Sequence, residues 1–206
     1  MLSFEELTGN PVAKRAIEVA AVGGLKVALV ALDREAARAL AEAASALGTG
    51  YVFMLTPCPC GNWGSPRPCN CEPEEIKAHQ RSVAWKEALR EADVWACVHG
   101  PDQNELQEFL GGQRGEPLRA IVRRVGAARP WFRERLGEAV QDLTRNAREL
   151  LLKAAEAYQF SWMDIRCVLR AAEAIRALGD APTIEAAHVA EAVEYRPQRL
   201  RGRIIP

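Results

Sequence analysis

The sequence predicts an α/β fold in which a short parallel sheet is flanked by helices and followed by a purely helical part. Three apolar runs of strand length, at residues 27–32, 51–55 and 94–98, alternate with segments of helical composition. Strands that alternate with helices are typical of a parallel sheet covered on its faces. Only helical patterns follow the third run. We therefore expect an α/β domain over residues 1–110 and a helical domain over residues 111–206.

The first helix is expected to begin at Asn10 and Pro11 and to end at Gly23 and Gly24. Asparagine is a favourable N-cap, proline suits the first helical position, and paired glycines end helices. The run over residues 27–32 that follows is apolar at every position. Such a continuous run between helix breakers predicts a strand that is buried on both faces.

The remaining elements of the first domain follow in the same alternation. Residues 33–47 are rich in Ala, Glu and Arg and predict a helix, and residues 51–55 predict a second buried strand. Residues 56–73 hold several prolines and glycines, so this segment must be a loop. One continuous helix is expected over residues 74–91, before the third strand at residues 94–98.

The second domain is expected to contain only helices. The predicted helices cover residues 117–136, 138–158, 161–178 and 184–195. Gly126 and Pro130 are expected to bend or break the first of them. Ser161 and Asp164 form a capping-box pattern at the start of the third. The tail from Arg196 is expected to be frayed.

Composition is that of an ordinary globular protein. The chain has 206 residues, of which 49% are hydrophobic and 26% charged, and its formal net charge is zero. Neutral overall charge gives no sign of a nucleic-acid or membrane partner, although local patches remain possible. No apolar run is long enough for a membrane span, and the N-terminus lacks the pattern of a secretory signal. We therefore expect a cytoplasmic protein with no membrane partner.

Four of the six cysteines lie within the loop over residues 56–73, and they are the most specific chemical feature of the chain. They form two Cys-x-Cys pairs, Cys58 with Cys60 and Cys69 with Cys71. In a reducing compartment, clustered cysteines favour metal binding over disulfides. Four thiolates are a typical closed, structural zinc site. Disulfides, a redox-active Cys-x-Cys dithiol and four unlinked thiols remain as alternatives. Cys97 and Cys167 are expected to be core residues.

Three segments resemble magnesium-chelatase-like AAA+ ATPases of the ComM/YifB type. The segment over residues 9–24 resembles the opening of that family. Thr56-Pro57-Cys58-Pro59-Cys60-Gly61 and the helix after Cys71 resemble its cysteine segment, and residues 184–196 resemble its lid helix. The resemblance implies a P-loop type of sheet with a C-terminal helical lid. It also implies a link to DNA recombination or uptake.

The nucleotide-binding parts of that family are missing here. A P-loop needs glycines, a lysine and a Ser/Thr to hold phosphates and Mg²⁺. After the first strand, this chain instead has Ala31-Leu32-Asp33-Arg34-Glu35-Ala36-Ala37-Arg38. No apolar run ends in Asp-Glu, so the Walker B motif is also absent. The sequence predicts a degenerate relative that neither binds nor hydrolyses ATP and is no enzyme.

The resulting functional hypothesis is a zinc-binding interaction module. Its AAA+-like shape would dock on a protein partner, either a second copy of itself or an intact AAA+ ATPase. A second hypothesis is a nucleic-acid-binding accessory protein, because arginines are dense in the segment before residue 136 and in the tail after Arg196. The candidate contact residues are Arg119, Arg123, Arg124, Arg129 and Arg133. The third hypothesis is the redox-active dithiol.

Overall fold

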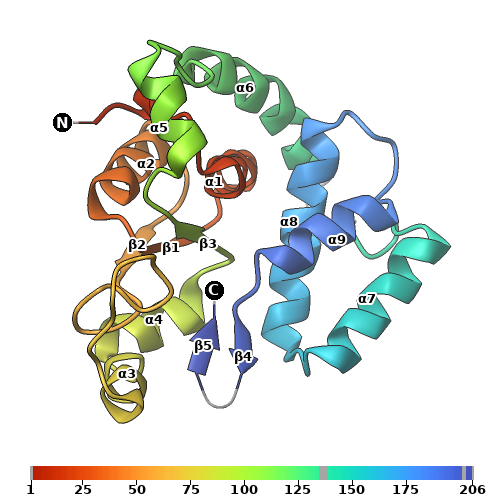
Figure 1. Cartoon of the computed structure of the whole chain (residues 1–206). Helices are drawn as coiled ribbons and strands as arrows, with labels where there is room; N and C mark the ends of the chain where they lie inside the picture. Colours follow the sequence, from red (N-terminus) through yellow and green to blue (C-terminus); the bar gives the residue numbers. More distant parts are fainter. Residues whose placement is uncertain (1, 135–138, 201–202, 206) are drawn as a thin grey trace.

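A computed structural model describes residues 2–134, 139–200 and 203–205 of the chain. It confirms an α/β fold with a small three-stranded parallel sheet flanked by helices (Figure 1). The strands are β1 (Val27–Ala31), β2 (Val52–Leu55) and β3 (Val94–Val98), in the spatial order β2-β1-β3. Both pairings are parallel, with Val27 opposite Val52 on one side and opposite Val94 on the other.

The two faces of the sheet pack against different helices. Val27, Leu29 and Ala31 join a large core formed with α1 (Pro11–Gly23) and α2 (Arg34–Leu47). The alternate residues of β1 join a smaller core with Trp85 of α4 (Val83–Glu91), whose ring centroid lies 5.8 Å from that of Trp95 in β3. Side chains of a strand alternate between faces, so a fully apolar β1 satisfies both cores.

Strand β2 is less buried than the sequence predicts. Its first three residues are only partly buried or exposed, and Met54 is 48% exposed. The predicted burial of this strand is therefore wrong. An edge position alone does not explain this, because β3 is also an edge strand and four of its five residues are buried.

Asn10 is not the side-chain cap that the sequence predicts for α1. Its backbone adopts a left-handed conformation with φ of 59°, and its side chain makes no cap hydrogen bond. Instead, its amide group donates to the carbonyl of His99 at 2.9 Å and accepts from the His99 backbone N–H at 2.8 Å. Asn10 thus fixes the start of α1 to the end of β3.

The helix expected over residues 74–91 is broken into two. Helix α3 (Pro73–His79) ends at Gln80, and α4 starts after the N-cap position Ser82. The loop after β3 also holds an unexpected helix, α5 (Gln103–Leu110), which Asp102 caps by accepting the backbone N–H of Glu105 at 2.8 Å. Figure 1 shows α5 close to the N-terminal segment, which includes the short 3-10 helix η1 (Phe4–Glu6).

The second half is helical, as expected, with some changes in its boundaries. Its helices are α6 (Leu118–Glu134), α7 (Arg145–Ala157), α8 (Trp162–Leu178) and α9 (Ala186–Glu194). Of the predicted bend or break in α6, the break is absent, because the helix continues through Gly126 and Pro130. The Ser161 capping box of α8 is confirmed. The tail forms the antiparallel strands β4 (Gln198–Leu200) and β5 (Arg203–Ile205) instead of fraying.

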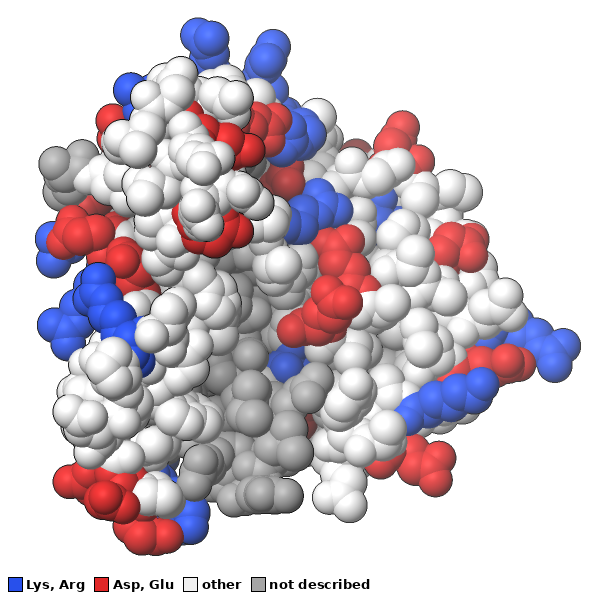
Figure 2. Space-filling view, viewed as in Figure 1, with Lys and Arg blue, Asp and Glu red and all other residues white. Residues whose placement is uncertain are grey.

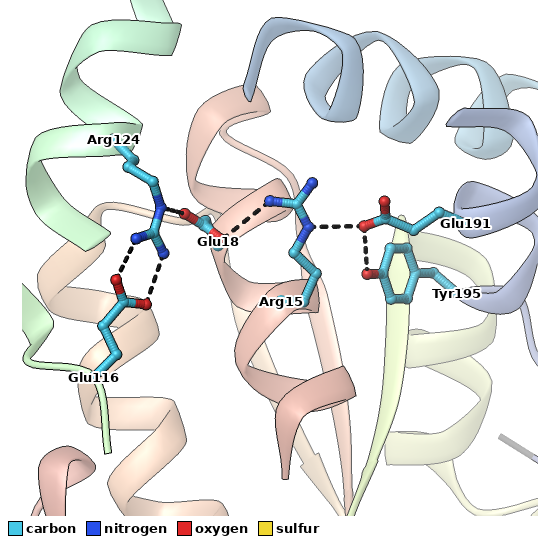
Figure 3. Close-up of polar contacts among 6 residues, drawn as sticks. All are labelled: Arg15, Glu18, Glu116, Arg124, Glu191 and Tyr195. Atoms are coloured by element: carbon cyan, nitrogen blue, oxygen red, sulfur yellow. Dashed lines mark hydrogen bonds and ion pairs between the residues drawn. The ribbon is translucent and has the colours of Figure 1, made fainter. Parts of the chain in front are cut away.

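The helical half packs directly on α1, and the large core runs through both halves. It includes Ile17 of α1, Val125 of α6, Val168 of α8 and Val189 of α9. A chain of ion pairs follows the same contacts across the surface (Figure 3). Among the described residues, no helix is long and apolar enough to cross a membrane.

Candidate metal centre and basic helix

The four clustered cysteines lie in the loop between β2 and α3, at the carboxyl end of the sheet. Two contacts with the carbonyl of Thr56 anchor the start of this loop: the indole N–H of Trp85 donates to it at 3.1 Å, and Nε2 of His79 lies 3.0 Å from it. The loop therefore leaves the sheet in a direction fixed by α3 and α4. His79, the one histidine near the cluster by sequence, is used for this anchoring.

Left-handed backbone at two glycines folds the loop back on itself. Gly61 has φ of +83° and Gly64 has φ of +86°, a region that side chains with a Cβ rarely adopt. The backbone N–H of Gly61 donates to the carbonyl of Cys58 at 3.0 Å, and the side-chain amide of Asn62 donates to the carbonyl of Pro68 at 3.2 Å. These contacts bring the second cysteine pair next to the first.

The geometry of the sulfur atoms fits a single tetrahedral ion. All four Sγ atoms lie within 4.8 Å of one another. The Sγ–Sγ separations are 3.4 Å between Cys58 and Cys60, 3.8 Å between Cys58 and Cys69, and 3.6 Å between Cys60 and Cys69. Metal–sulfur bonds of about 2.3 Å at tetrahedral angles put neighbouring sulfurs about 3.8 Å apart. The cluster of Cys58, Cys60, Cys69 and Cys71 could therefore hold a metal ion.

The four thiols differ in burial and in acidity. Cys58 is fully buried, and it accepts a hydrogen bond from the backbone N–H of Trp63 at 3.3 Å. A hydrogen bond from the backbone of Asn62, with others from the Cys58 and Cys71 thiols, lowers the pKa of the exposed Cys60 to about 6. Cys60 is thus largely a thiolate at neutral pH, which is the form that binds a metal.

The pKa of Cys71 is shifted in the opposite direction to that of Cys60. A hydrogen bond from the backbone of Cys60 favours its thiolate, but desolvation and the hydrogen bonds among the thiols outweigh that contact and raise the pKa of Cys71 to about 12. One more negative charge beside an existing thiolate is unfavourable without a cation. Binding of a metal ion would supply that cation and release the proton.

Two guanidinium groups lie beside the cluster. Arg34 and Arg67 line a cavity of about 450 Å³ together with Cys60. Asp33 and Glu35 line the same cavity, so its charged lining is balanced between the two signs. Cys97 and Cys167 are outside the cluster, and burial raises the pKa of Cys97 to about 11. Cys167 is buried as predicted, whereas Cys97 is only partly buried and packs against the smaller core.

The five candidate arginines of the basic helix all lie on α6, but they differ in their contacts. Arg124 is held by Glu116 and by the buried Glu18, whose Oε1 lies 2.6 Å from its Nε (Figure 3). Arg15 continues this network from Glu18 to Glu191. Arg124 therefore joins α6 to α1.

Arg129 contacts the ends of two helices. Its guanidinium donates to the carbonyl of Ala21 at 2.9 Å and to the carbonyl of Gly48 at 3.1 Å, and also to that of Leu47. These carbonyls belong to the last turns of α1 and α2, where positive charge is favourable.

The three remaining arginines form one exposed face. Arg119, Arg123 and Arg133 make no ion pair with any residue that the structure describes. With about 100° per helical residue, they fall within about 80° of one another around α6. Figure 2 shows basic side chains along the upper edge of the molecule, where α6 runs. Arg135 and Arg201, which belong to the two arginine-dense segments of the sequence, lie outside the described residues.

Fold and site together define an α/β protein with a helical second half and a four-cysteine cluster able to hold a metal ion. The chain matches no protein-family model, and no curated protein sequence matches it. The resemblance to magnesium-chelatase-like ATPases therefore stays a prediction.

Proposed function

We propose that this protein is a non-catalytic, zinc-binding interaction module with a degenerate AAA+-like fold of P-loop type and a C-terminal helical lid. The observation that carries the proposal is the meeting of four sulfur atoms within 4.8 Å. Zinc is the favoured ion because it combines thiolate preference with tetrahedral geometry and no redox chemistry. A site closed by four cysteines has no open position for a substrate, which favours a structural role.

The start of α2 supports the absence of ATP chemistry. In a P-loop protein, the backbone N–H groups at this position bind phosphates. Here the Asp33 carboxylate accepts the backbone N–H of Ala36 at 2.9 Å, and Glu35 adds a second negative charge to the first turn. Two carboxylates at this helix end would repel a phosphate. Measurable ATP hydrolysis, or a rise in melting temperature with Mg-ATP, would contradict the proposal.

Metal analysis of the purified protein tests the zinc centre. We expect about one zinc per chain, retained on dialysis and released when the protein unfolds. Cys58→Ser should lose the metal, because it removes the buried ligand of the cluster. Cys97→Ala is the matched control and should keep it. A metal-free protein whose Cys58 and Cys60 cycle between thiol and disulfide would instead establish the redox alternative.

For the interaction itself, we propose a protein partner, either a second copy of the chain or an intact AAA+ ATPase. Native mass spectrometry of the zinc-loaded protein, alone and mixed with such an ATPase, distinguishes the two. Loss of the complex in the Cys58→Ser variant would place the zinc loop at the interface. A monomer that binds neither would rule out both partners.

Nucleic-acid binding is the second candidate, and the exposed face of Arg119, Arg123 and Arg133 favours it. We expect single- or double-stranded DNA to bind at low salt and to dissociate as salt rises. The variant with all three residues changed to Gln should bind at least tenfold more weakly. Arg145→Gln is the control, because Arg145 is exposed and pairs with Glu149 on α7. Equal binding by both variants would exclude this face.

A further inference from the structure

A second cavity lies at the carboxyl end of the sheet, and it shares Asp33 and Glu35 with the cavity beside Cys60. Its volume is about 240 Å³. It lies among the N-terminal segment, the first turn of α2, the end of β3 and helix α5, which Figure 1 places near one another. In a sheet of order β2-β1-β3, the chain passes from β1 to β2 on one side and then crosses to β3 on the other, so the switch point lies between β1 and β3. Open α/β sheets bind ligands outside the strand ends at this point.

The wall formed by α5 is apolar and incompletely covered. Leu106 is 46% exposed and Phe109 is 39% exposed, and both line the cavity. No residue of α5 is buried, so this eight-residue helix gains little from packing. Leu7, which is buried, and Leu2 continue the apolar lining on the other side. A ligand with an apolar body would cover surface that this part of the chain leaves open.

The polar lining is acidic. Four carboxylates line the cavity, those of Glu6, Asp33, Glu35 and Glu105, and no lysine or arginine does among the described residues. Glu105 is held in place from two sides: its Oε2 accepts the backbone N–H of Asp102 at 2.9 Å, and its carboxylate lies against Gly9. A Cβ atom at Gly9 would collide with that carboxylate, so the glycine makes room for the charge.

At the edge of the cavity, Arg114 shows how a cation contacts two of the lining residues, Glu6 and Phe109. Arg114 places its guanidinium 3.2 Å from the Glu6 carboxylate and 5.9 Å from the centre of the Phe109 ring. A cation against a carboxylate and an aromatic face is favourable on both counts. The cavity itself combines the same two features. Glu6 and Glu35 are already paired with Arg114 and Arg38, whereas Asp33 and Glu105 accept backbone N–H groups.

We propose that this cavity binds a small organic cation, an ammonium or guanidinium group carried on a short apolar body. Its volume is below the usual 300–1,000 Å³ of drug-sized pockets, which fits a free amine or a single side chain. The charged end would lie among the carboxylates, and the apolar body would lie against Leu106 and Phe109. This site goes beyond the proposed zinc module and does not depend on the metal.

Three ligands that share one body and differ in charge test the proposal: 2-phenylethylamine, 2-phenylethanol and 3-phenylpropanoate. Titration of the full-length protein is followed by two-dimensional amide NMR. We expect saturable shifts at Leu106 and Phe109 with the amine, and at least tenfold weaker binding of the alcohol and the acid. Equal binding of all three, or no saturable shift with the amine, would overturn the proposal.

Variants locate the site. Glu105→Gln keeps the size of the side chain and removes one charge, so amine affinity should fall about tenfold. Glu156→Gln is the matched control, because Glu156 lies on α7 and does not line the cavity. This variant should bind the amine like the wild type. An unchanged affinity in Glu105→Gln would also overturn the assignment. Zinc content should stay the same in both variants, so a failure here is separate from a failure of the zinc centre.

A further titration distinguishes two sources of such a cation, a side chain of another protein and a free small molecule. An acetylated and amidated Gly-Arg-Gly peptide carries a guanidinium on a side chain, and agmatine carries one on a free molecule. Tighter binding of the peptide would identify a protein side chain as the ligand, and tighter binding of agmatine would identify a free amine. Failure of both, together with failure of the phenyl amine, would contradict the cation site.

Discussion

At the scale of single residues, the structure separates arginines that support the fold from arginines that are free to bind. Arg124 and Arg129 are similar to their neighbours in sequence, yet both are used inside the molecule. Arg119 and Arg123 lie on the same helix and face outward. The number of arginines in a segment does not show which of them are free. Whether an arginine of α6 is free depends on which part of the protein its turn of the helix faces.

Arg129→Ala should therefore cost stability. The substitution leaves the carbonyls of Ala21, Leu47 and Gly48 without their charged donor. Hydrogen bonds to charged groups contribute about 1.5–3 kcal/mol, so we expect a loss of about 2 kcal/mol in the free energy of unfolding. Urea denaturation measures it. Arg123→Ala, on the exposed face, should change stability by less than about 0.5 kcal/mol; a similar loss in both variants would refute the difference in role.

At the scale of elements, the loop over residues 56–73 is held by its backbone and by its neighbours. Thr56 ties it to α3 and α4, and Gly61 and Gly64 supply the left-handed turns. These local features help to place the sulfurs near one another. A metal ion would then add the cross-link that such a short loop, with little apolar burial of its own, needs for stability.

Gly61→Ala and Gly126→Ala should have opposite effects on stability. At Gly61, the φ of +83° is unfavourable for alanine and should cost about 1 kcal/mol. At Gly126, inside α6 with open space around it, alanine should add about 0.5–1 kcal/mol through helix propensity. Urea denaturation measures both changes. Competition with a chromophoric chelator should show weaker zinc binding only in Gly61→Ala, and a stabilised Gly61→Ala would show that the turn is not required.

At the scale of the whole molecule, the two predicted domains share one core. Apolar residues of α1 face the sheet on one side and the helices α6 and α8 on the other. Ion pairs from Arg124 and Arg15 strengthen the same junction (Figure 3). Removing the helical half would expose apolar surface of α1, so neither half is expected to be stable alone.

We accordingly expect one cooperative unfolding transition. Tryptophan fluorescence reports on the α/β half through the buried Trp85 and Trp95, and on the helical half through Trp131 and Trp162. Circular dichroism reports on all helices. The two curves in urea should coincide, as they do for a two-state domain. Two separate transitions would show instead that residues 1–110 and 111–206 fold as independent domains.

Much of this architecture could be predicted from local signals in the sequence. The continuous apolar run of β1, the Ser161 capping box and the paired Cys-x-Cys motifs each depend on residues close together in the chain. Steric preference, helix capping and ligand chemistry act at that range, so the α/β class, the start of α8 and the candidate metal ligands followed directly. The Gly and Pro content of the cysteine segment likewise predicted a loop.

Features that depend on contacts between distant segments were decided only by the tertiary structure. Asparagine is a residue type that favours the N-cap, but the Asn10 side chain hydrogen-bonds to the backbone of His99, 89 residues away. Strand β2 is apolar but lies at the edge, and Arg129 caps helices that precede it by more than 80 residues. The proposed cation-binding cavity is likewise lined by the N-terminal segment, α2 and α5, which are distant in the sequence. The sequence by itself thus determined which residues can bind metal or form strands. Packing determined which side chains contact other parts of the protein and which remain open to a ligand. The reason is that burial depends on neighbours that are distant in the chain.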